Sequence, residues 1–409
     1  MICYFLFNLK QSTIETRQFR STVQPLGGEY GQRRKRIDDV CRITNITHLA
    51  ASIENKVYFE DRSVLYCGNL KVATTFMDGF LPHIFQCGNS TNCYSRPSRY
   101  KSLIDKAYSF TIVRDPYARL FSGYENKLFL PNKFWSTLGA DVVAVVRPNA
   151  SWSSLAIGHD VKFSEMVKYV IMKGSDERLN PHLMPMHKLC NPCQATYNFV
   201  GKLESMSTDI ENLVSDLKQN HRVPVNTSSS FEIEADVRQK QLVGPVHHLF
   251  STFNFLRKYA SKSMHGKLRR NNIFLRTWSS FQIRGIILKN FTMPFNPTDH
   301  VTHDIYADAV LTAAEKSAPF KSQLKAQRLE ALVQAYKTVP MDLMEQLRDF
   351  VQIDCRLFGY DDRPAQLFQR ADEADTDISP DEFNYFQGLF FPTSGNATEA
   401  EDQHAGDEE

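Results

Sequence analysis

The sequence lacks the features that would assign it to several common classes of protein. Its N-terminal stretch MICYFLFNL is apolar for fewer than ten residues, whereas a membrane-spanning helix needs about 20 and a signal sequence usually begins with basic residues. Lys and Arg total 48 against 46 Asp and Glu, a net charge of +2, so no overall field favours nucleic acid as a partner. These properties therefore show no evident membrane anchor and predict no nucleic-acid partner.

The composition predicts a folded protein with a sizeable core. The chain has 409 residues, 42% of them apolar, which is enough for one large domain or two small ones. Charge is unevenly distributed, because residues 253–289 contain basic residues and no acidic one, while no Lys or Arg follows Arg370. Segments of this kind are usually solvated surface.

The cysteines and the glycosylation sequons bear on the cellular compartment. The eight cysteines fit either reduced buried thiols or a few disulfides, and their number does not decide between the two. Asn-x-Ser/Thr sequons exceed the roughly three that composition predicts, which favours a secretory compartment. They begin at Asn45, Asn89, Asn149, Asn226, Asn290 and Asn396.

Two strand-loop-helix units predict a parallel α/β sheet. Residues 63–67 (SVLYC) have the pattern of a buried strand and precede the loop GNLK and a helix that ends near Pro82. Residues 109–113 (SFTIV) repeat this plan, with Asp115 at the N-cap and Pro116 at the first position of the next helix. Because parallel sheets bind ligands at the carboxyl ends of their strands, the functional site is expected there.

The rest of the chain is expected to cover or flank this sheet. Residues 163–174 and 204–220 have the period of amphipathic helices, whereas residues 225–320 show no sustained period. Five segments are predicted: an N-terminal stem or linker (1–40), the core (41–225), a poorly structured insertion (226–320), the C-terminal part of the domain (321–365) and a disordered acidic tail (366–409).

The residues that follow the two strands are suited to an anion. Lys71 lies beside a helix N-terminus, whose free N–H groups favour a phosphate or sulfate, although GNLKVATT is not a Walker A loop. Arg114 offers a bidentate fork and Ser122 one further donor. Taken singly, Lys71 is explained as a solvated surface lysine, and Arg114 as the partner of Asp115 in a local ion pair. Neighbouring parallel strands end at one edge, so the two units together favour an anion site.

Four segments carry motifs of a known family in the same order and spacing. They are YCGNLKVATTFMDGFL, FTIVRDPYARLFSGYENKL, HLMPMHKLCNPCQATYNFVGKLESMSTDIENLV and DFVQIDCRLFGY. They resemble the Golgi carbohydrate sulfotransferases of the chondroitin/dermatan 4-O-sulfotransferase group. The resemblance covers about residues 60–218 and 340–362, and the string R-D-P-x-x-R-L-x-S-x-Y is its most specific part.

This resemblance implies transfer of a sulfuryl group from 3'-phosphoadenylyl sulfate (PAPS) to a glycan hydroxyl, on a fold related to P-loop kinases. Such transfer resembles phosphoryl transfer, in which a lysine offsets the charge gained by the leaving phosphate, and the scheme requires no metal. By the resemblance, the 5'-phosphosulfate would be bound by Lys71, Val72, Thr74 and Thr75, and the 3'-phosphate by Arg114 and Ser122.

A base must also accept the proton of the acceptor hydroxyl, and His or Glu suits this role near neutral pH. The candidates are His182, His187 and Glu204, with His83 as a further one. Two positions depart from the family: His182 is followed by Leu rather than Trp, and CGNL replaces a proline-containing loop. A catalytically dead family member that binds a glycan or a nucleotide therefore stays an alternative.

The segment with His182, His187, Cys190 and Cys193 has residue types suited to zinc, at a spacing unusual for a zinc finger. The resemblance instead makes the two cysteines disulfide partners, for example of Cys87 or Cys93.

The resemblance also implies a place for the protein in the cell. It predicts the lumenal side of the Golgi membrane, a glycosaminoglycan or an N- or O-linked sugar chain as acceptor, and membrane association of the full-length protein. A P-loop-like kinase is the other rival, and it would need a GK[ST] loop and a magnesium-binding carboxylate, neither of which is evident.

Overall fold

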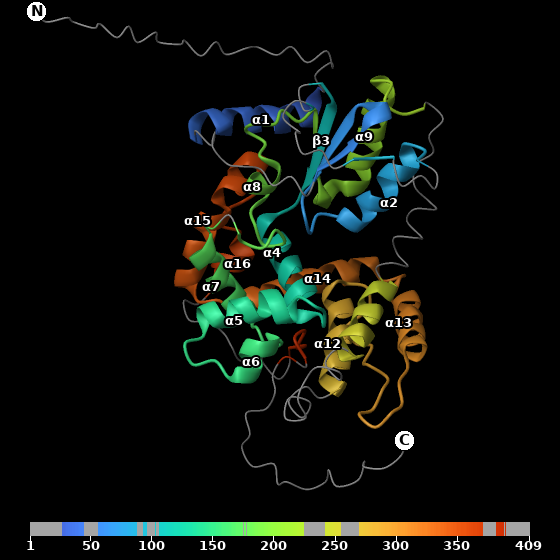
Figure 1. Ribbon diagram of the computed structural model, residues 1–409, viewed down its shortest axis with the longest axis vertical. Coiled ribbons are helices and arrows are strands. Elements are labelled where there is room, and N and C mark those ends of the chain that lie inside the picture. Colours follow the sequence, from blue (N-terminus) through green and yellow to red (C-terminus); the bar gives the residue numbers. More distant parts are fainter. Residues whose placement is uncertain are drawn as a thin grey trace, which may run out of the picture.

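The structure has an upper part that contains the sheet and a lower part made of helices (Figure 1). The computed structural model describes residues 27–44, 56–87, 93–95, 103, 106–174, 176, 178–224, 242–254, 270–370, 382–387 and 389. Within these residues, no helix combines the length and the apolar character needed to cross a membrane.

The described strands form one mostly parallel sheet in the order β1-β2-β3-β4. β1 (Lys56–Phe59) pairs antiparallel with β2 (Val64–Gly68), whereas β3 (Tyr108–Val113) pairs in parallel with β2 and with β4 (Phe199–Lys202). Every residue of β2 and β3 is buried, as expected for parallel strands that are covered on both faces. The predicted α/β fold with a parallel sheet flanked by helices is confirmed.

Helices cover both faces of this sheet. α1 (Gly28–Thr44) and α9 (Met206–Gln219) pack against β4, and α2 (Thr74–Ile84) and α9 lie to the right of β3 in Figure 1, with α1 to its left. α4 (Pro116–Tyr124) leads from the sheet into the lower part.

The structure further describes α5 (Ala140–Val146), α6 (Trp152–Ile157), α7 (Phe163–Lys173), α8 (Met186–Cys190), α12 (Arg270–Ile283), α13 (His303–Ser317), α14 (Lys321–Lys337), α15 (Met341–Phe358) and α16 (Ala365–Phe368). Short 3-10 turns lie at Glu60–Arg62 and Leu203–Ser205, and π-turns at Glu125–Phe129 and Trp135–Gly139.

The main apolar core extends from the sheet to α7 and α14, and a second, separate apolar cluster lies in the lower part. Residues 242–254, α12 and α13 bury Leu249, Phe281 and Tyr306 in one cluster. These elements fall within residues 226–320, where the sequence shows no sustained period. The reason is that α12 is buried on several sides and includes polar residues, so it lacks the single apolar face that a periodic pattern reveals.

Arg276 of α12 is the clearest of these buried polar residues. It is 1% exposed, and its guanidinium donates to the backbone oxygens of Leu128, Phe129 and His159 at 2.6–2.9 Å. The π-turn Glu125–Phe129 after α4 is therefore fastened to α12.

Parts of both predicted flanking segments also pack onto the core. Residues 28–40, predicted as stem, belong to α1, in which Arg33 and Ile37 are buried. Within the predicted tail, Tyr385 and Phe386 are buried, and the ring centroid of Phe386 lies 5.6 Å from that of Phe129. Apolar side chains in these polar segments give them a place in the core. Residues 1–26 and 390–409 lie outside the described part, and the domain boundaries stay predictions.

Disulfides link distant parts of the described chain. They join Cys41 to Cys193, Cys67 to Cys190 and Cys87 to Cys93. The prediction that Cys190 and Cys193 pair with Cys87 or Cys93 is wrong, because the latter two, six residues apart, bond to each other. The zinc alternative is excluded as well, since both cysteines of that set are in disulfides rather than available as thiolates.

A buried ion pair fastens α1 to the sheet. Arg33 donates from Nη1 to Oδ2 of Asp209 at 2.6 Å and to the backbone oxygen of Val200 in β4 at 3.0 Å. Asp209 is 1% exposed and also accepts from the Tyr30 hydroxyl and the Lys202 N–H. Because the carboxylate is so deeply buried, it depends on these donors to replace water.

We predict that Arg33→Ala lowers the free energy of unfolding by about 3 kcal/mol, because the change leaves a buried carboxylate without its cation. Urea unfolding of the oxidised protein measures this. Lys35→Ala, at an exposed position of the same helix, serves as the control and should change stability by no more than about 0.5 kcal/mol. Equal losses in the two variants would contradict a stabilising role for the buried pair.

Candidate active site

Three turns of the chain meet at the carboxyl edge of the parallel strands. Arg114, directly after β3, donates from Nη1 to the backbone oxygen of Lys71, which follows β2, at 3.1 Å. The N–H of Asp115 donates to Oε1 of Glu204, which follows β4, at 2.8 Å. The structure therefore brings Lys71, Arg114 and Glu204 together, as the parallel order of the strands predicts.

The loop between β2 and α2 has an unusual backbone conformation. Lys71 and Ala73 both have positive φ values, of 68° and 51°, in a region that residues other than glycine rarely occupy. Asn69 is fully buried and fixes the start of the loop by donating from Nδ2 to the Ile112 carbonyl at 3.0 Å. α2 then begins at Thr74, with first-turn N–H groups that have no partner within the helix. Left-handed residues on either side of Val72 suit a nest of N–H groups for an anion.

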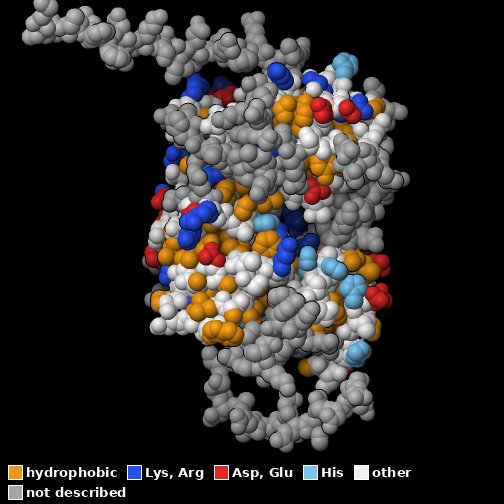
Figure 2. Space-filling model, viewed as in Figure 1, with side chains coloured by type: hydrophobic (Ala, Val, Ile, Leu, Met, Phe, Trp, Pro, Cys, Tyr) orange, Lys and Arg blue, Asp and Glu red, His pale blue; other side chains and the backbone are white. Residues whose placement is uncertain are grey.

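A cluster of cationic side chains surrounds this loop. Burial, together with the charges of Lys127, Arg284 and Arg114, lowers the pKa of Lys71 to about 7. Burial and the charge of Lys133 lower the pKa of Lys127 to about 8. Figure 2 shows Lys and Arg side chains in a hollow near the centre of one face. Because like charges raise each other's energy in such a place, a bound anion would relieve their repulsion.

Arg119 joins the loop to the segment that carries His182. It is 2% exposed, and it donates from Nε to the Leu70 carbonyl at 2.8 Å and from Nη1 to the Met184 carbonyl at 2.7 Å. Burial lowers its pKa to about 10, which leaves it charged near neutral pH. This linking role of Arg119 was not predicted from the sequence, in which the only signal for it is the second arginine of R-D-P-x-x-R.

α4 begins as the sequence predicts and carries Ser122 away from the strand end. The Asp115 side chain accepts from the Ala118 N–H at 2.8 Å, and Pro116 occupies the first helical position. Ser122 lies seven residues after the cap and is half-buried. Residues at this spacing lie on one face of a helix, so Ser122 is on the same side of α4 as the cap.

The imidazole of His182 lies within the electrostatic field of the same cationic cluster. Burial first, and then the charges of Lys127, Lys71 and Arg119, lower its pKa to about 3, so its imidazole is neutral near pH 7. Its Nδ1 lies 2.9 Å from Oδ1 of Asn180. Because an amide oxygen accepts, Nδ1 carries the proton and Nε2 keeps a lone pair with which to accept another.

The other candidate bases are engaged elsewhere. His187 is buried, and its Nδ1 lies 2.8 Å from Oδ1 of Asp354 in α15. Glu204 accepts at Oε1 from a backbone N–H and at Oε2 from the Tyr360 hydroxyl at 2.7 Å. His83 is exposed in the last turn of α2, about 13 Å along the helix from the loop. Of these candidates, His182 has the geometry that best suits a base at the cluster.

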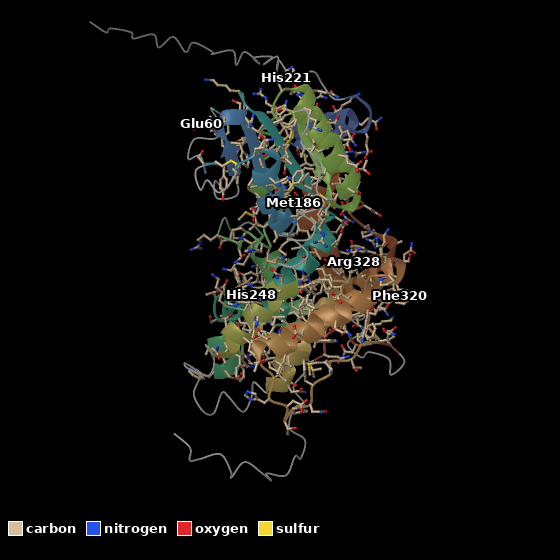
Figure 3. The ribbon with its side chains drawn as sticks, turned by 90° about the vertical axis from the view of Figure 1, so that its right-hand side faces the viewer. Glu60, Met186, His221, His248, Phe320 and Arg328 are labelled. Atoms are coloured by element: carbon tan, nitrogen blue, oxygen red, sulfur yellow. A yellow bond between two sulfur atoms is a disulfide. The ribbon has the colours of Figure 1, made fainter. Side chains whose placement is uncertain are left out.

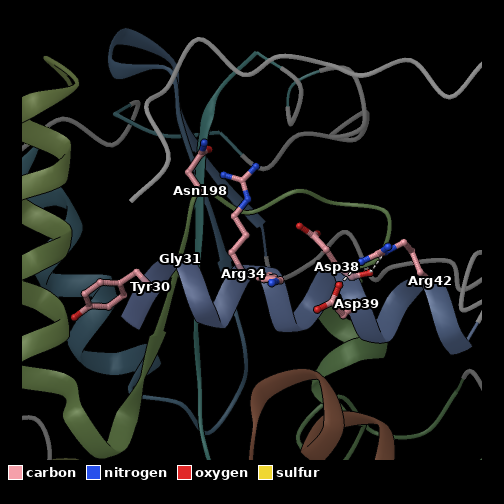
Figure 4. Close-up of a pocket in the computed structure, with 8 residues that line it drawn as sticks. Tyr30, Gly31, Arg34, Asp38, Asp39, Arg42 and Asn198 are labelled. Atoms are coloured by element: carbon pink, nitrogen blue, oxygen red, sulfur yellow. Dashed lines mark hydrogen bonds and ion pairs between the residues drawn. The ribbon is translucent and has the colours of Figure 1, made fainter. Parts of the chain in front are cut away.

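The cavity in Figure 4 lies along α1, apart from the cationic cluster, and has a volume of about 250 Å³. Its lining includes Arg34 and Asp38, and an ion pair joins Asp39 to Arg42. Its three basic residues are largely offset by two aspartates, so it has a much smaller excess of positive charge than the cationic cluster. Among the described residues, no group of three or more His, Cys, Asp or Glu is arranged to hold a metal ion.

The sequence of the region that forms this site matches a known protein family. The sulfotransferase family matches residues 56–269, just over half of the 409 residues. The chain belongs to the sulfotransferase family. The matched region contains the four strands described above and the residues Lys71, Arg114 and His182.

Several carbohydrate sulfotransferases are similar to parts of this chain. Carbohydrate sulfotransferase 14 of Homo sapiens is 35% identical over 114 residues, which cover 28% of this chain and 30% of the relative. Carbohydrate sulfotransferase 11 of Rattus norvegicus is 29% identical over 207 residues, with 43% and 58% covered. Carbohydrate sulfotransferase 9 of Homo sapiens is 27% identical over 181 residues, with 40% and 41% covered. The chain thus spans less than two thirds of each of these relatives, and no solved structure matches it.

The lowered pKa of Lys71 predicts unusual reactivity of this amine. At pH 7, a substantial fraction of Lys71 should be unprotonated, because burial and neighbouring cations disfavour the charged form. An amine-acylating reagent at pH 7, followed by peptide mass spectrometry, should therefore modify Lys71 ahead of the exposed Lys35. Lys35 is the internal reference in the same digest. Modification of Lys71 no faster than Lys35 would contradict the proposed electrostatic environment.

Proposed function

We propose that this protein is a carbohydrate O-sulfotransferase that transfers a sulfuryl group from PAPS to a hydroxyl of a glycan. The observation that carries the proposal is the meeting of Lys71 and Arg114 at one sheet edge, in a chain that belongs to the sulfotransferase family. Two cationic turns at adjacent strand ends suit a ligand with two separate anionic groups, and PAPS has a 5'-phosphosulfate and a 3'-phosphate.

In this proposal the donor lies across the two strand ends. Lys71, with the backbone around Val72 and the first turn of α2 at Thr74 and Thr75, binds the 5'-phosphosulfate. Arg114 and Ser122 bind the 3'-phosphate. The positive φ values in the loop support the first assignment, because strained backbone is retained where a function requires it.

The transfer itself follows from these positions. The acceptor hydroxyl oxygen attacks sulfur while the bond from sulfur to the phosphate oxygen breaks, and the leaving phosphate gains negative charge that Lys71 offsets. The proton of the hydroxyl passes to Nε2 of His182. A bound donor also neutralises part of the charge that lowers the pKa of His182, so donor binding makes this imidazole a stronger base. Glu204 supports the site by holding the Asp115 N–H.

Glycans as acceptors and the Golgi lumen as compartment complete the proposal. The similar proteins are carbohydrate sulfotransferases by name. The disulfides of the described chain fit an oxidising compartment, and Asn149 and Asn290, which begin two sequons, are exposed. We propose a lumenal, membrane-associated Golgi enzyme that acts on a glycosaminoglycan or a glycoprotein sugar chain.

The donor assignment predicts separable effects of two substitutions. Lys71→Ala should lower kcat/KM for PAPS about 10²- to 10³-fold, because it removes charge stabilisation from the transition state. Arg114→Ala should raise KM for PAPS about 10- to 100-fold, as expected for the loss of a charge-assisted hydrogen bond. Labelled PAPS with a panel of desulfated glycosaminoglycans and N-glycans measures both effects and identifies the acceptor.

Calorimetry with adenosine 3',5'-bisphosphate, the product of the donor, separates the possible failures. Tight binding without metal and without turnover on any acceptor would indicate a catalytically dead member of the family. Full activity in both variants would overturn the donor site.

The assignment of His182 predicts a loss of kcat. His182→Ala should lower kcat about 10²- to 10⁴-fold with little change in the affinity for adenosine 3',5'-bisphosphate, because the residue acts on the acceptor proton. His83→Ala, on the exposed end of α2, is the matched control and should keep wild-type kcat. Comparable activity of both variants would refute the role of His182 as base.

A further inference from the structure

Glu125 is a buried carboxylate that interacts electrostatically with the cationic cluster. It follows α4 as the first residue of the π-turn Glu125–Phe129 and is 4% exposed. Its backbone N–H donates to the carbonyls of Phe121 and Ser122, which places it one turn beyond Ser122 on the helix. A carboxylate rarely stays buried without a compensating partner, so the groups around it decide what it does.

Those groups include Lys71 and Arg114, the two cations proposed to bind the donor. The charge of Glu125 raises the pKa of Lys71 and of Lys127, in each case against the larger effect of burial. Burial lowers the pKa of Arg114, and Glu125 opposes this shift together with Glu204 and Asp115. Glu125 therefore reduces the repulsion among three cations that come from three different turns of the chain.

Ser280 of α12 fixes this carboxylate from the other side. The fully buried Ser280 hydroxyl donates to Oε1 of Glu125, and Arg276, one turn earlier on α12, holds the end of the same π-turn through the Leu128 and Phe129 carbonyls. The π-turn is thus fastened at both ends to α12, which starts at residue 270, just after the region matched by the sulfotransferase family.

We propose that Glu125, held by Ser280 in the π-turn that also carries Lys127, is a positioning residue of the donor site, which favours the charged form of Lys71 before the donor arrives. This inference rests on the proposed function, because it concerns the lysine assigned to the 5'-phosphosulfate. It gives α12 a part in donor binding.

The charges around Lys71 set the expected pH dependence. Lys71 is influenced by Lys127 of the π-turn, by Arg284 after α12 and by Arg114 after β3, all of which favour its neutral form, and by Glu125, which favours the charged form. Lys71 in turn lowers the pKa of His182. With a pKa of about 7, Lys71 loses its proton as the pH rises through neutrality, and affinity for an anion falls over the same range. Without the carboxylate this loss occurs at lower pH.

The test is calorimetric titration of the full chain with adenosine 3',5'-bisphosphate between pH 5.5 and 8.5. Glu125→Gln keeps an oxygen that can accept from Ser280 and removes only the charge. We expect the midpoint of the fall in affinity to move to lower pH by about half a unit or more, with affinity at pH 5.5 equal to or greater than that of the wild type. The ligand titrates identically in all variants, so the difference between curves reports the protein.

Three further variants make the outcome decisive. Ser280→Ala, which frees the carboxylate without removing its charge, should shift the midpoint in the same direction by a smaller amount. Lys71→Arg should abolish the Lys71 step, because arginine stays charged throughout this range, and so separates it from the titration of Lys127. Glu60→Gln is the control. It removes the same charge at the end of the sheet that lies farther from α14 (Figure 3), and it should leave the curve unchanged.

An unchanged midpoint in both Glu125→Gln and Ser280→Ala, with wild-type binding intact, would overturn the role of Glu125 and leave the proposed function standing. Absence of binding by the wild type at every pH would instead refute the donor site itself.

Discussion

The parallel pairing of β2, β3 and β4 is the constraint on which the site depends. The carboxyl ends of parallel strands lie at the same edge of the sheet, so three turns that are far apart in the sequence become neighbours there. Each turn contributes one charged residue, namely Lys71, Arg114 and Glu204, and backbone groups tie the turns together. Tyr360, which comes soon after α15, bonds to Glu204, so the closing part of the domain is fastened to the same edge.

Two buried arginines near the site are held by neutral partners, whereas Arg33 is paired with the carboxylate of Asp209. Arg119 and Arg276 both donate to backbone carbonyls. A carbonyl oxygen accepts hydrogen bonds from a guanidinium without cancelling its charge. Arg119 and Arg276 therefore fix the loops around the site and still contribute to its positive potential. Glu125 is a carboxylate among these cations, and its charge offsets part of the repulsion that Lys71 and Lys127 experience.

The location of the site at the carboxyl edge of the sheet could be predicted from the sequence, because short local patterns determine the elements that form it. The short buried strands, the Asp115 cap and Pro116 at the helix start are signals contained within a few residues. The helix α12 escaped prediction because burial on several sides removes the amphipathic period. Arg33 and Arg119 escaped for another reason: their partners lie far away in the chain or are backbone atoms, and an exposed and a buried arginine look alike in a sequence. The pairing of the cysteines depends on the same long-range geometry.

The disulfides impose an order on how the protein is made. Cys67, near the end of β2, bonds to a residue 123 positions later, and Cys41 of α1 to one 152 positions later. Neither bond can form until the ribosome has produced Cys190 and Cys193, by which time β1, β2 and β3 have all been synthesised. The loop that follows β2 therefore gains its covalent support late, after the segment with His182 has emerged. Each of these two bonds needs its own oxidation, and both oxidations can follow only after the two sides of the site have been synthesised.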